Sequence, residues 1–291
     1  TVSQDSSVFT ITPTTNTSNG GTFTLTITAT DNVNGAINFP SNFSLTFQVT
    51  VTNSKYTSAL VTAVGTSDNN NITDASSNSH SLTISGNTSA SSFSPYRHPG
   101  YSLKFSNQYA RIAVAENSTT RVLGNNFTVE GWIYVTGGNT GLRTIIAQGK
   151  SGVYSPFNVY YDSSTSKFVI DLSSTGSSWN IASQVASANT YSENEWHHWA
   201  LVRDGSSFKL YANGSLDSTI ATSSATLMTP TVQTGIGARE GSNAQYNFYG
   251  YMKDLRLVIG TAVYSGSSYT VPTELLEDIT NTKLLLCASP S

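Results

Sequence analysis

The sequence predicts an all-β protein, and three observations support that prediction. Charged residues make up only 11% of the 291 residues and hydrophobic residues 37%, with 15 Tyr and 12 Phe. The apolar runs are short and alternate with polar side chains, while Ser, Thr and Asn fill the spaces between them. Asp204-Gly205 and Asn213-Gly214 supply the positive φ that tight hairpins require. We therefore expect many short strands and almost no helix.

The segment 195–216 carries the plainest strand signal. Apolar and polar side chains alternate with period two in Trp199 to Val202 and again in Phe208 to Tyr211. The Asp-Gly turn separates these runs, and the Asn-Gly turn ends the second. Period-two alternation between such turns predicts consecutive antiparallel strands, a β-meander.

Residues 1–52 also predict strands, at Val8 to Ile11, Thr22 to Thr30 and Phe43 to Val51. Residues 53–55, Asn-Ser-Lys, form a short polar junction to the remainder of the chain. The pattern resembles the last strands of immunoglobulin-like or cadherin-like repeats. Since a full repeat needs about 100 residues, residues 1–52 are expected to be a partial immunoglobulin-like module.

Five motifs in fixed order resemble the laminin G-like, concanavalin A-like lectin and glucanase modules. They are the opening Asp74 to Asn87, Gly100 to Phe105, Asn126 to Tyr134, the meander at Glu195 to Leu216, and the closing strand Gly250 to Leu257. The resemblance implies a jelly-roll β-sandwich over residues 56–275. Forms with a tail such as Gly260 to Tyr264 look most like modules of bacteriophage virion proteins and bacterial adhesins.

The tail, residues 276–291, holds the apolar run Leu284 to Cys287. It compares with Leu60 to Val64, because each is a short apolar strand with a polar entry. The tail therefore either begins a further copy of the module or pairs beside its opening strand. Cys287 alone forms no intrachain disulfide within these residues, and we expect it to be a small buried hydrophobe.

Composition disfavours two classes of partner. With 14 Lys plus Arg against 17 Asp plus Glu, the net charge of −3 lacks the clustered cations that bind nucleic acid. No apolar run approaches the roughly 20 residues that a membrane-spanning helix needs. We expect a location outside cells or on a virion surface, with multivalent or homo-oligomeric display.

An enzyme of the glucanase class is the first alternative function. Glycoside hydrolysis needs two carboxyl groups flanking the sugar, and Glu193 and Glu195 are the candidate pair. The glucanases of this fold carry E-x-D-x-x-E, whereas this chain has Glu at the third place and His198 at the sixth. A solvated turn before a strand is the plainer explanation, so no catalytic residue is assigned.

Two metal hypotheses follow from the polar residues. His197 and His198 are adjacent in a strand and point to opposite faces, so they do not bind one ion together. His198 is expected to be packed and hydrogen-bonded, and Trp196 to anchor the core. The oxygen-rich loop 68–74 favours calcium, with Asp68, Asn70 and Asp74 as candidate ligands, although Asn and Asp are also common in ordinary turns.

Sugar binding would use aromatic side chains as platforms and polar groups for the hydroxyls, all on loops of a rigid scaffold. The candidates, each in a turn-rich setting, are Tyr154, Trp179, Arg239, Asn243 and Tyr246. Core or interface packing is the alternative role for each. The expected function is a non-enzymatic exposed adhesion module that binds a surface glycan or neighbouring subunits, and the second alternative is a purely architectural fibre or decoration protein.

Overall fold

The computed structural model describes residues 2–5, 8–11, 21–28, 42–49, 57–63, 70–76, 78–95, 101–106, 110–137, 140–241 and 246–288. The chain divides into two compact units, Thr1–Ser54 and Lys55–Ser291. In the first unit, β1 (Val2–Asp5) pairs with β2 (Val8–Ile11), and β3 (Gly21–Thr28) pairs with β4 (Asn42–Val49). The three strands expected there are present, and their membership in an immunoglobulin-like repeat stays a prediction.

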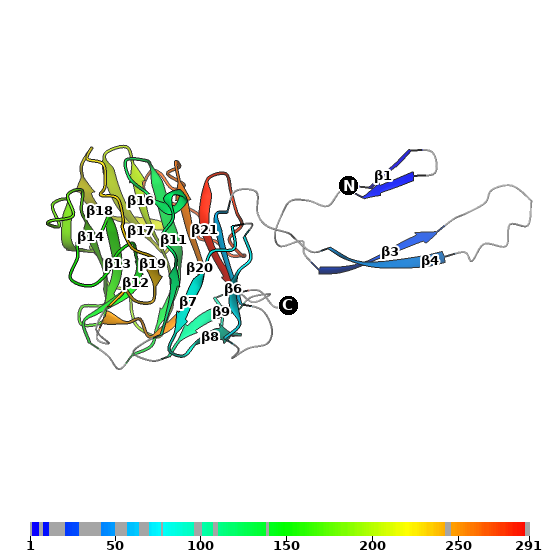
Figure 1. The fold of residues 1–291 in the computed structure, drawn as a ribbon, viewed down its shortest axis with the longest axis horizontal. Coiled ribbons are helices and arrows are strands. Elements are labelled where there is room, and N and C mark those ends of the chain that lie inside the picture. The colour runs from blue at the N-terminus through cyan, green and yellow to red at the C-terminus, as the bar shows by residue number, and fades with distance from the viewer. Residues whose placement is uncertain are drawn as a thin grey trace, which may run out of the picture. The chain divides into compact units, whose positions relative to one another are not determined.

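The second unit is a sandwich of two sheets packed face to face (Figure 1). One sheet has seven strands in the order β15-β14-β13-β12-β19-β10-β7, each antiparallel to its neighbours. These strands are, along the chain, β7 (Leu82–Ser85), β10 (Arg111–Val114), β12 (Leu142–Ala147), β13 (Phe157–Asp162), β14 (Lys167–Leu172), β15 (Ala182–Ala186) and β19 (Thr234–Ile236).

The other sheet has ten strands, with the main order β18-β17-β16-β11-β20-β21-β5-β6; in addition, β9 pairs with β20, and β8 pairs with β9. They are β5 (Ala59–Ala63), β6 (Ile72–Asp74), β8 (Thr88–Ser91), β9 (Ser102–Phe105), β11 (Phe127–Val135), β16 (Trp196–Asp204), β17 (Ser207–Ala212), β18 (Ser215–Thr222), β20 (Gly250–Ile259) and β21 (Thr282–Ala288). Helical structure in the described residues of this unit is limited to the short 3₁₀ turn η2 (Ser118–Thr120) and to Tyr246. The predicted all-β sandwich is therefore confirmed.

Period-two alternation places the core between the sheets. On β13, Phe157, Val159 and Tyr161 are fully buried in the core cluster, and the intervening side chains point to the outer face of the seven-stranded sheet. The predicted meander is β16-β17-β18, and its turns have positive φ at Gly205 and Asn213. The sequence therefore set both the strands and the turns of this region.

Strand β21 pairs antiparallel with β20 and parallel with β5, so it lies between the opening and closing strands of the sandwich. Leu284 and Leu286 of β21 belong to the core cluster. The tail strand thus forms part of this module, and a further copy of the module beyond it stays a prediction. The backbone of Cys287 lies in β21, but its side chain is outside the described residues.

The prediction that Trp196 anchors the core is wrong. Trp196 is half-buried on the outer face of the ten-stranded sheet, where it packs with Tyr134, Tyr251 and Phe93 at ring-centroid distances of 5.3–6.4 Å. Trp199, at the opposite parity of β16, is the tryptophan in the core, with 0% exposure. Both faces of β16 carry apolar side chains, so alternation alone did not tell which face meets the second sheet.

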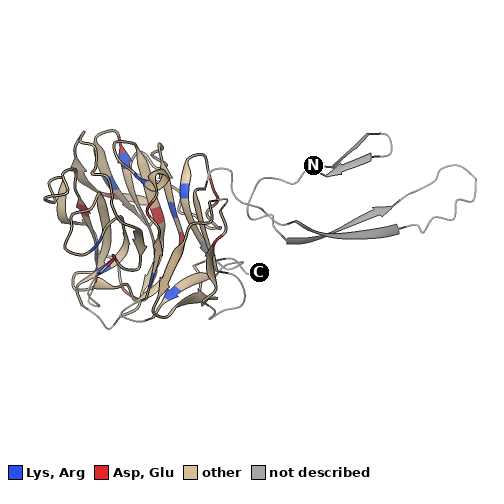
Figure 2. Cartoon of the chain, viewed as in Figure 1, with Lys and Arg blue, Asp and Glu red and all other residues tan. Residues whose placement is uncertain are grey.

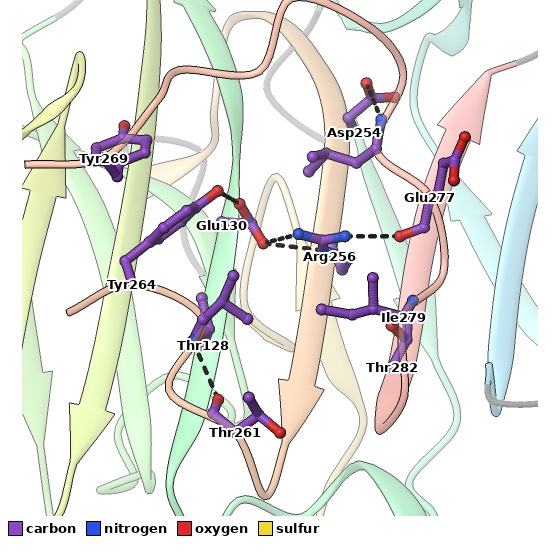
Figure 3. Close-up of polar contacts among 12 residues, drawn as sticks. Thr128, Glu130, Asp254, Arg256, Thr261, Tyr264, Tyr269, Glu277, Ile279 and Thr282 are labelled. Carbon is purple, nitrogen blue, oxygen red and sulfur yellow. Dashed lines mark hydrogen bonds and ion pairs between the residues drawn. The ribbon is translucent and has the colours of Figure 1, made fainter.

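A buried polar network holds the segment 260–281, called here the covering segment, against the outer face of the ten-stranded sheet (Figure 3). Glu130, with 0% exposure, accepts hydrogen bonds at Oε1 from Arg256 Nε at 2.9 Å and Nη2 at 2.6 Å. The hydroxyl of Tyr264 donates to Glu130 Oε2, and Arg256 Nη1 donates to the carbonyl of Glu277 at 2.7 Å. The covering segment is thus fixed by hydrogen bonds to two neighbouring strands.

His198 extends this network. It is fully buried, and its Nδ1 lies 2.7 Å from the hydroxyl of Tyr269 in the covering segment. Burial, together with the positive charge of Arg256, lowers the pKa of His198 to about 3, so the ring is neutral at physiological pH. The expectation of a packed, hydrogen-bonded histidine is confirmed. His197 points to the other face, where its Nε2 lies 2.9 Å from the carbonyl of Ser192.

Candidate functional site

Three loops at the ends of strands of the seven-stranded sheet enclose a pocket of about 230 Å³, lined by Gly152, Val153, Tyr154, Trp179 and Arg239. Tyr154 lies between β12 and β13, Trp179 lies between β14 and β15, and Arg239 follows β19. Loops on a rigid scaffold are where binding groups usually occur. The sandwich therefore brings together residues that are up to 87 positions apart in the printed sequence, from Gly152 to Arg239.

Four of the five predicted sugar-binding residues form one cluster. The rings of Tyr154 and Trp179 meet edge to face with centroids 5.1 Å apart. The guanidinium of Arg239 lies 5.7 Å from the ring centroid of Tyr246 and 5.7 Å from that of Tyr160. The fifth predicted residue, Asn243, lies outside the described residues.

Hydrogen bonds within the loop 173–180 hold Trp179 in place. The hydroxyl of Ser173 donates to the carbonyl of Ser178 at 2.7 Å. The side chain of Asn180 accepts from the backbone N–H of Ser174 at 3.0 Å and donates to the hydroxyl of Ser174 at 2.8 Å. The short hydroxyl and amide side chains thus order the loop, which limits the entropy that a ligand would have to remove.

The loop that carries Tyr154 is tied to the segment that carries Arg239. The backbone N–H of Ser151 donates to the carbonyl of Glu240 at 2.8 Å, and Lys150 and Glu240 form a parallel β-bridge. Tyr154 and Trp179 are both half-buried, and Val153 is 40% exposed. Two walls of the pocket are therefore fixed to each other while aromatic surface remains open to solvent.

Sequence reasoning missed the residues on the sheet beneath this pocket. Tyr160 on β13 and Asp171 on β14 are 2% and 3% exposed and lie on the outer face of the sheet. Burial raises the pKa of Asp171, although the backbone N–H of Gln184 donates to its Oδ1 at 2.7 Å. The parity of β13, which puts Tyr160 on the same face as Asn158 and Asp162, was the available signal.

A second hollow, of about 490 Å³, lies on the same face and is lined by Gly141, Leu142, Asp162, Ser164, Thr165, Lys167, Val169, Gln184 and Ala186. Val169 is the direct cross-strand partner of Tyr160, whose ring centroid lies 5.7 Å from the guanidinium of Arg239. Asp162 accepts hydrogen bonds from Ser164 and Thr165 at 2.9 and 2.8 Å. Lys167 Nζ donates to the carbonyls of Ser187 and Ala188 at 2.9 and 3.1 Å. The charged groups here have partners within the protein.

The candidate catalytic pair lies elsewhere. Glu193 is half-buried in the turn before β16, where it interacts electrostatically with Arg143. Glu195 is exposed, and neither glutamate lines either hollow. No carboxylate in the described part of the chain lines the pocket of Tyr154 and Trp179. The arrangement there suits binding through rings and a guanidinium.

In the opening motif, Asp74 holds the turn together through hydrogen bonds. Its Oδ1 accepts from the backbone N–H of Leu60 at 2.8 Å and of Ser76 at 2.9 Å, and its Oδ2 accepts from the Ser76 hydroxyl and from the N–H of His80 at 2.9 and 2.7 Å. Asn78 donates to the carbonyl of Ser58 at 2.8 Å. These bonds tie the turn after β6 to β5.

The structure describes two of the three candidate calcium ligands, Asn70 and Asp74. Asn70 is exposed, and Asp68 lies outside the described residues. Both oxygens of Asp74 already accept hydrogen bonds. Among the described residues, no group of three or more His, Cys, Asp or Glu side chains could hold a metal ion. Calcium at Asp68, Asn70 and Asp74 stays a prediction.

Lys and Arg are interspersed with Asp and Glu along the strands of the sandwich in the view of Figure 2. Within the described ranges, no helix has the length and apolar character needed to cross a membrane.

A family sequence model, Laminin_G_3, described as the concanavalin A-like lectin/glucanases superfamily, matches residues 105–260, more than half of the chain. The matched region runs from the end of β9 to the end of β20 and includes every lining residue of both hollows. A search of curated proteins found no match to this sequence.

Solved structures align with this chain at low sequence identity. The binding domain of Paraclostridial Mosquitocidal Protein 1 aligns with a TM-score of 0.52 and 14% identity, over 66% of this chain and 47% of that one. The binding domain of botulinum neurotoxin DC in complex with SialylT gives a TM-score of 0.47 and 16% identity, over 70% and 48%. Trypanosoma rangeli sialidase in complex with the inhibitor DANA gives 0.40 and 11%, over 58% and 27%. The chain spans about half or less of each structure, and the first likeness shows the fold alone.

Proposed function

Because the chain belongs to the concanavalin A-like lectin/glucanases superfamily, we propose that it is a non-enzymatic carbohydrate-binding module of a protein exposed on a virion or cell surface. One observation carries the proposal: Tyr154, Trp179 and Arg239 converge on one pocket from three separate loops. Half-exposed rings offer a platform for the apolar face of a pyranose, and the guanidinium offers donors to its oxygens. The pre-ordered loops would keep the entropic cost of binding low.

The proposed location on a virion or cell surface rests on a sequence resemblance and on the gain in avidity from multivalent display. The segment Gly260 to Tyr264 resembles the tails of modules in bacteriophage virion proteins and bacterial adhesins. A shallow pocket binds one sugar weakly, and display of many copies raises the avidity without any new contact. A fibre, capsid appendage or cell-surface array would supply such display, with a glycan or a neighbouring subunit as partner.

A glycan panel tests the proposal. The full chain is expected to bind at least one oligosaccharide, and Trp179→Ala should weaken that binding by about tenfold or more, the loss expected for a buried aromatic contact. Trp196→Ala is the matched control, because Trp196 is also half-buried but lies on the outer face of the other sheet. Absence of binding to every glycan, or equal loss in both variants, would contradict the proposal.

A secreted glycan hydrolase is the competing function, favoured only by the glucanases in the superfamily. Glu193→Gln and Glu195→Gln, separately and together, test it against release of reducing ends from polysaccharides. The binding proposal expects no hydrolysis by the unmodified chain, so there is no activity for the variants to lose. Hydrolysis that disappears with either glutamate would replace the binding proposal with the enzymatic one.

A purely architectural role is the third candidate. It expects stable assembly in sedimentation experiments together with no binding on the glycan panel. The pocket then serves packing between subunits, and Trp179→Ala should weaken assembly rather than sugar binding.

A further inference from the structure

Arg239 is half-buried, and its donors are used differently from those of the buried Arg203 and Arg256. Arg256 has an acceptor for each of its three nitrogens, namely Glu130 and the carbonyl of Glu277. Arg203 likewise donates from Nε, Nη1 and Nη2 to three backbone carbonyls, at 3.2, 3.0 and 2.9 Å. Arg239 Nε is buried and has no acceptor among the described residues, and Arg239 makes no ion pair with them.

The position of this guanidinium is nevertheless fixed. It lies 5.7 Å from the ring centroids of both Tyr160 and Tyr246, which is within cation–π distance. Arg239 also lines the pocket that contains Trp179 and Tyr154. The Arg239 guanidinium is a charged, planar donor group that two rings hold at the wall of an open pocket. This arrangement suits the binding of a ligand better than a role in stabilising the fold.

No described carboxylate forms an ion pair with Arg239. Asp171 interacts electrostatically with Arg239, but it is 3% exposed, and its Oδ1 accepts a hydrogen bond from the backbone N–H of Gln184 at 2.7 Å. The second hollow contains Asp162 and Lys167, and both already have hydrogen-bond partners within the protein. The positive charge of Arg239 is thus the group in these two hollows with unused capacity for an anion.

We propose that the pocket selects an acidic glycan, with a carboxylate or sulfate group of the sugar bound by Arg239 while a pyranose ring contacts Trp179 and Tyr154. This inference rests on the proposed carbohydrate-binding function. A guanidinium forms two parallel hydrogen bonds to a carboxylate or a sulfate, and such charge-assisted bonds are about twice as strong as neutral ones. The second hollow, whose charged groups already have partners within the protein, accommodates neutral parts of the same glycan.

The experiment uses paired oligosaccharides and titration calorimetry with the full chain at 150 mM salt. The pairs are uronic-acid oligomers with their carboxyl-reduced counterparts, sialylated oligosaccharides with their asialo forms, and sulfated oligosaccharides with their desulfated forms. At least one acidic member should bind about tenfold or more tightly than its neutral counterpart, as expected for one hydrogen-bonded charge. The pair that shows the preference tells whether a carboxylate or a sulfate is the bound group.

Two variants separate a specific contact from general electrostatics. Arg239→Gln should abolish the preference by weakening the acidic ligand about tenfold while the neutral counterpart binds as before. Lys150→Gln is the matched control, because it removes one exposed positive charge from the neighbouring strand end, joined by a β-bridge to Glu240, without lining the pocket. Thermal unfolding of both variants checks that the loss of the Arg239 ring contacts has not unfolded the sandwich.

The outcomes are distinguishable. If acidic and neutral members of every pair bind alike, or if Lys150→Gln lowers the preference as much as Arg239→Gln, the acidic-glycan inference is overturned and the carbohydrate-binding function stands. If no oligosaccharide binds in any pair or on the wider panel, the proposed function itself fails, and the inference fails with it. If Lys150→Gln keeps the preference for the acidic glycan and Arg239→Gln loses it, the result supports both the carbohydrate-binding function and the acidic-glycan inference.

Discussion

The buried pair Glu130–Arg256 offers the sharpest test of how the sandwich is held together. Glu130 is fully buried, the side chain of Arg256 is 7% exposed, and the closest contact between them is 2.6 Å. Glu130→Gln would leave the Arg256 charge buried with only the Glu277 carbonyl and an amide oxygen as acceptors. Removing one partner of a buried pair costs about 3–5 kcal/mol. We expect about 3 kcal/mol, the lower end, because the amide oxygen still accepts a hydrogen bond.

The second variant tests the physical reason for that loss. In Glu130→Gln/Arg256→Met no charge remains to be desolvated, so the double variant should be more stable than Glu130→Gln alone. The pair Arg121–Glu116 is the control, because its closest contact is also 2.6 Å but its side chains are 30% and 27% exposed. Glu116→Gln should change stability little, because solvent screens an exposed pair.

Urea unfolding followed by tryptophan fluorescence measures these differences, since Trp199 lies in the core of the same sheet. A loss of about 3 kcal/mol should also lower Tm by about 6–12 °C in a domain of this size. The electrostatic reasoning would be refuted by a loss below about 1 kcal/mol for Glu130→Gln. It would also be refuted if the double variant were less stable than the single one.

Three further predictions concern a glycine, a histidine and an aspartate. Gly250→Ala should lower the free energy of unfolding in urea by more than about 1 kcal/mol. Gly250 has a φ of 134°, and a Cβ there would lie 2.0 Å from the carbonyl oxygen of Tyr134. An unchanged stability would show that the strand relaxes to make room. Burial and the charge of Arg256 lower the pKa of His198 to about 3 in the folded protein, so between about pH 6.5 and 3 the unfolded chain binds one more proton. The free energy of unfolding should therefore fall as the pH drops through that range. If His198→Gln loses as much stability between pH 7 and pH 5 as the unmodified chain, the reasoning is contradicted. Burial alone would raise the pKa of Asp217, but hydrogen bonds from Tyr191 and two backbone N–H groups lower it below its usual value. Its stabilising contribution should be present above about pH 4 and be lost below it, and Asp217→Asn should cost about 1 kcal/mol at pH 7 and progressively less in acid.

Much of the fold was predictable because strand signals are local. Alternation and turn residues predicted the meander 195–216, and positive φ at Gly205 and Asn213 explains why those turns needed such residues. The resemblance motifs also have physical causes in the structure. Glu130 of one motif pairs with Arg256 of another, and Asp74 accepts the four hydrogen bonds that fold the opening turn.

The candidate site was predictable only residue by residue. Tyr154, Trp179, Arg239 and Tyr246 were identified because aromatic and polar side chains in turn-rich segments are suited to binding. Their assembly into one cluster was not readable, because nothing local relates loops after β12, β14 and β19. The floor of the site was missed for a related reason, since nothing local relates Tyr160 on β13 to the loop whose Arg239 packs against its ring.

The amino-acid sequence by itself determined that this chain forms short strands joined by hydroxyl-rich and amide-rich turns, because strand propensity and turn geometry depend on neighbours along the chain. Only the tertiary structure decided which face of each strand meets the other sheet. Trp196 and Trp199 occupy the two faces of one strand, and only packing against the second sheet distinguishes them. The same packing brought three distant loops together and left Arg239 with a donor unused, because contacts between sheets are non-local and follow from how two whole layers fit.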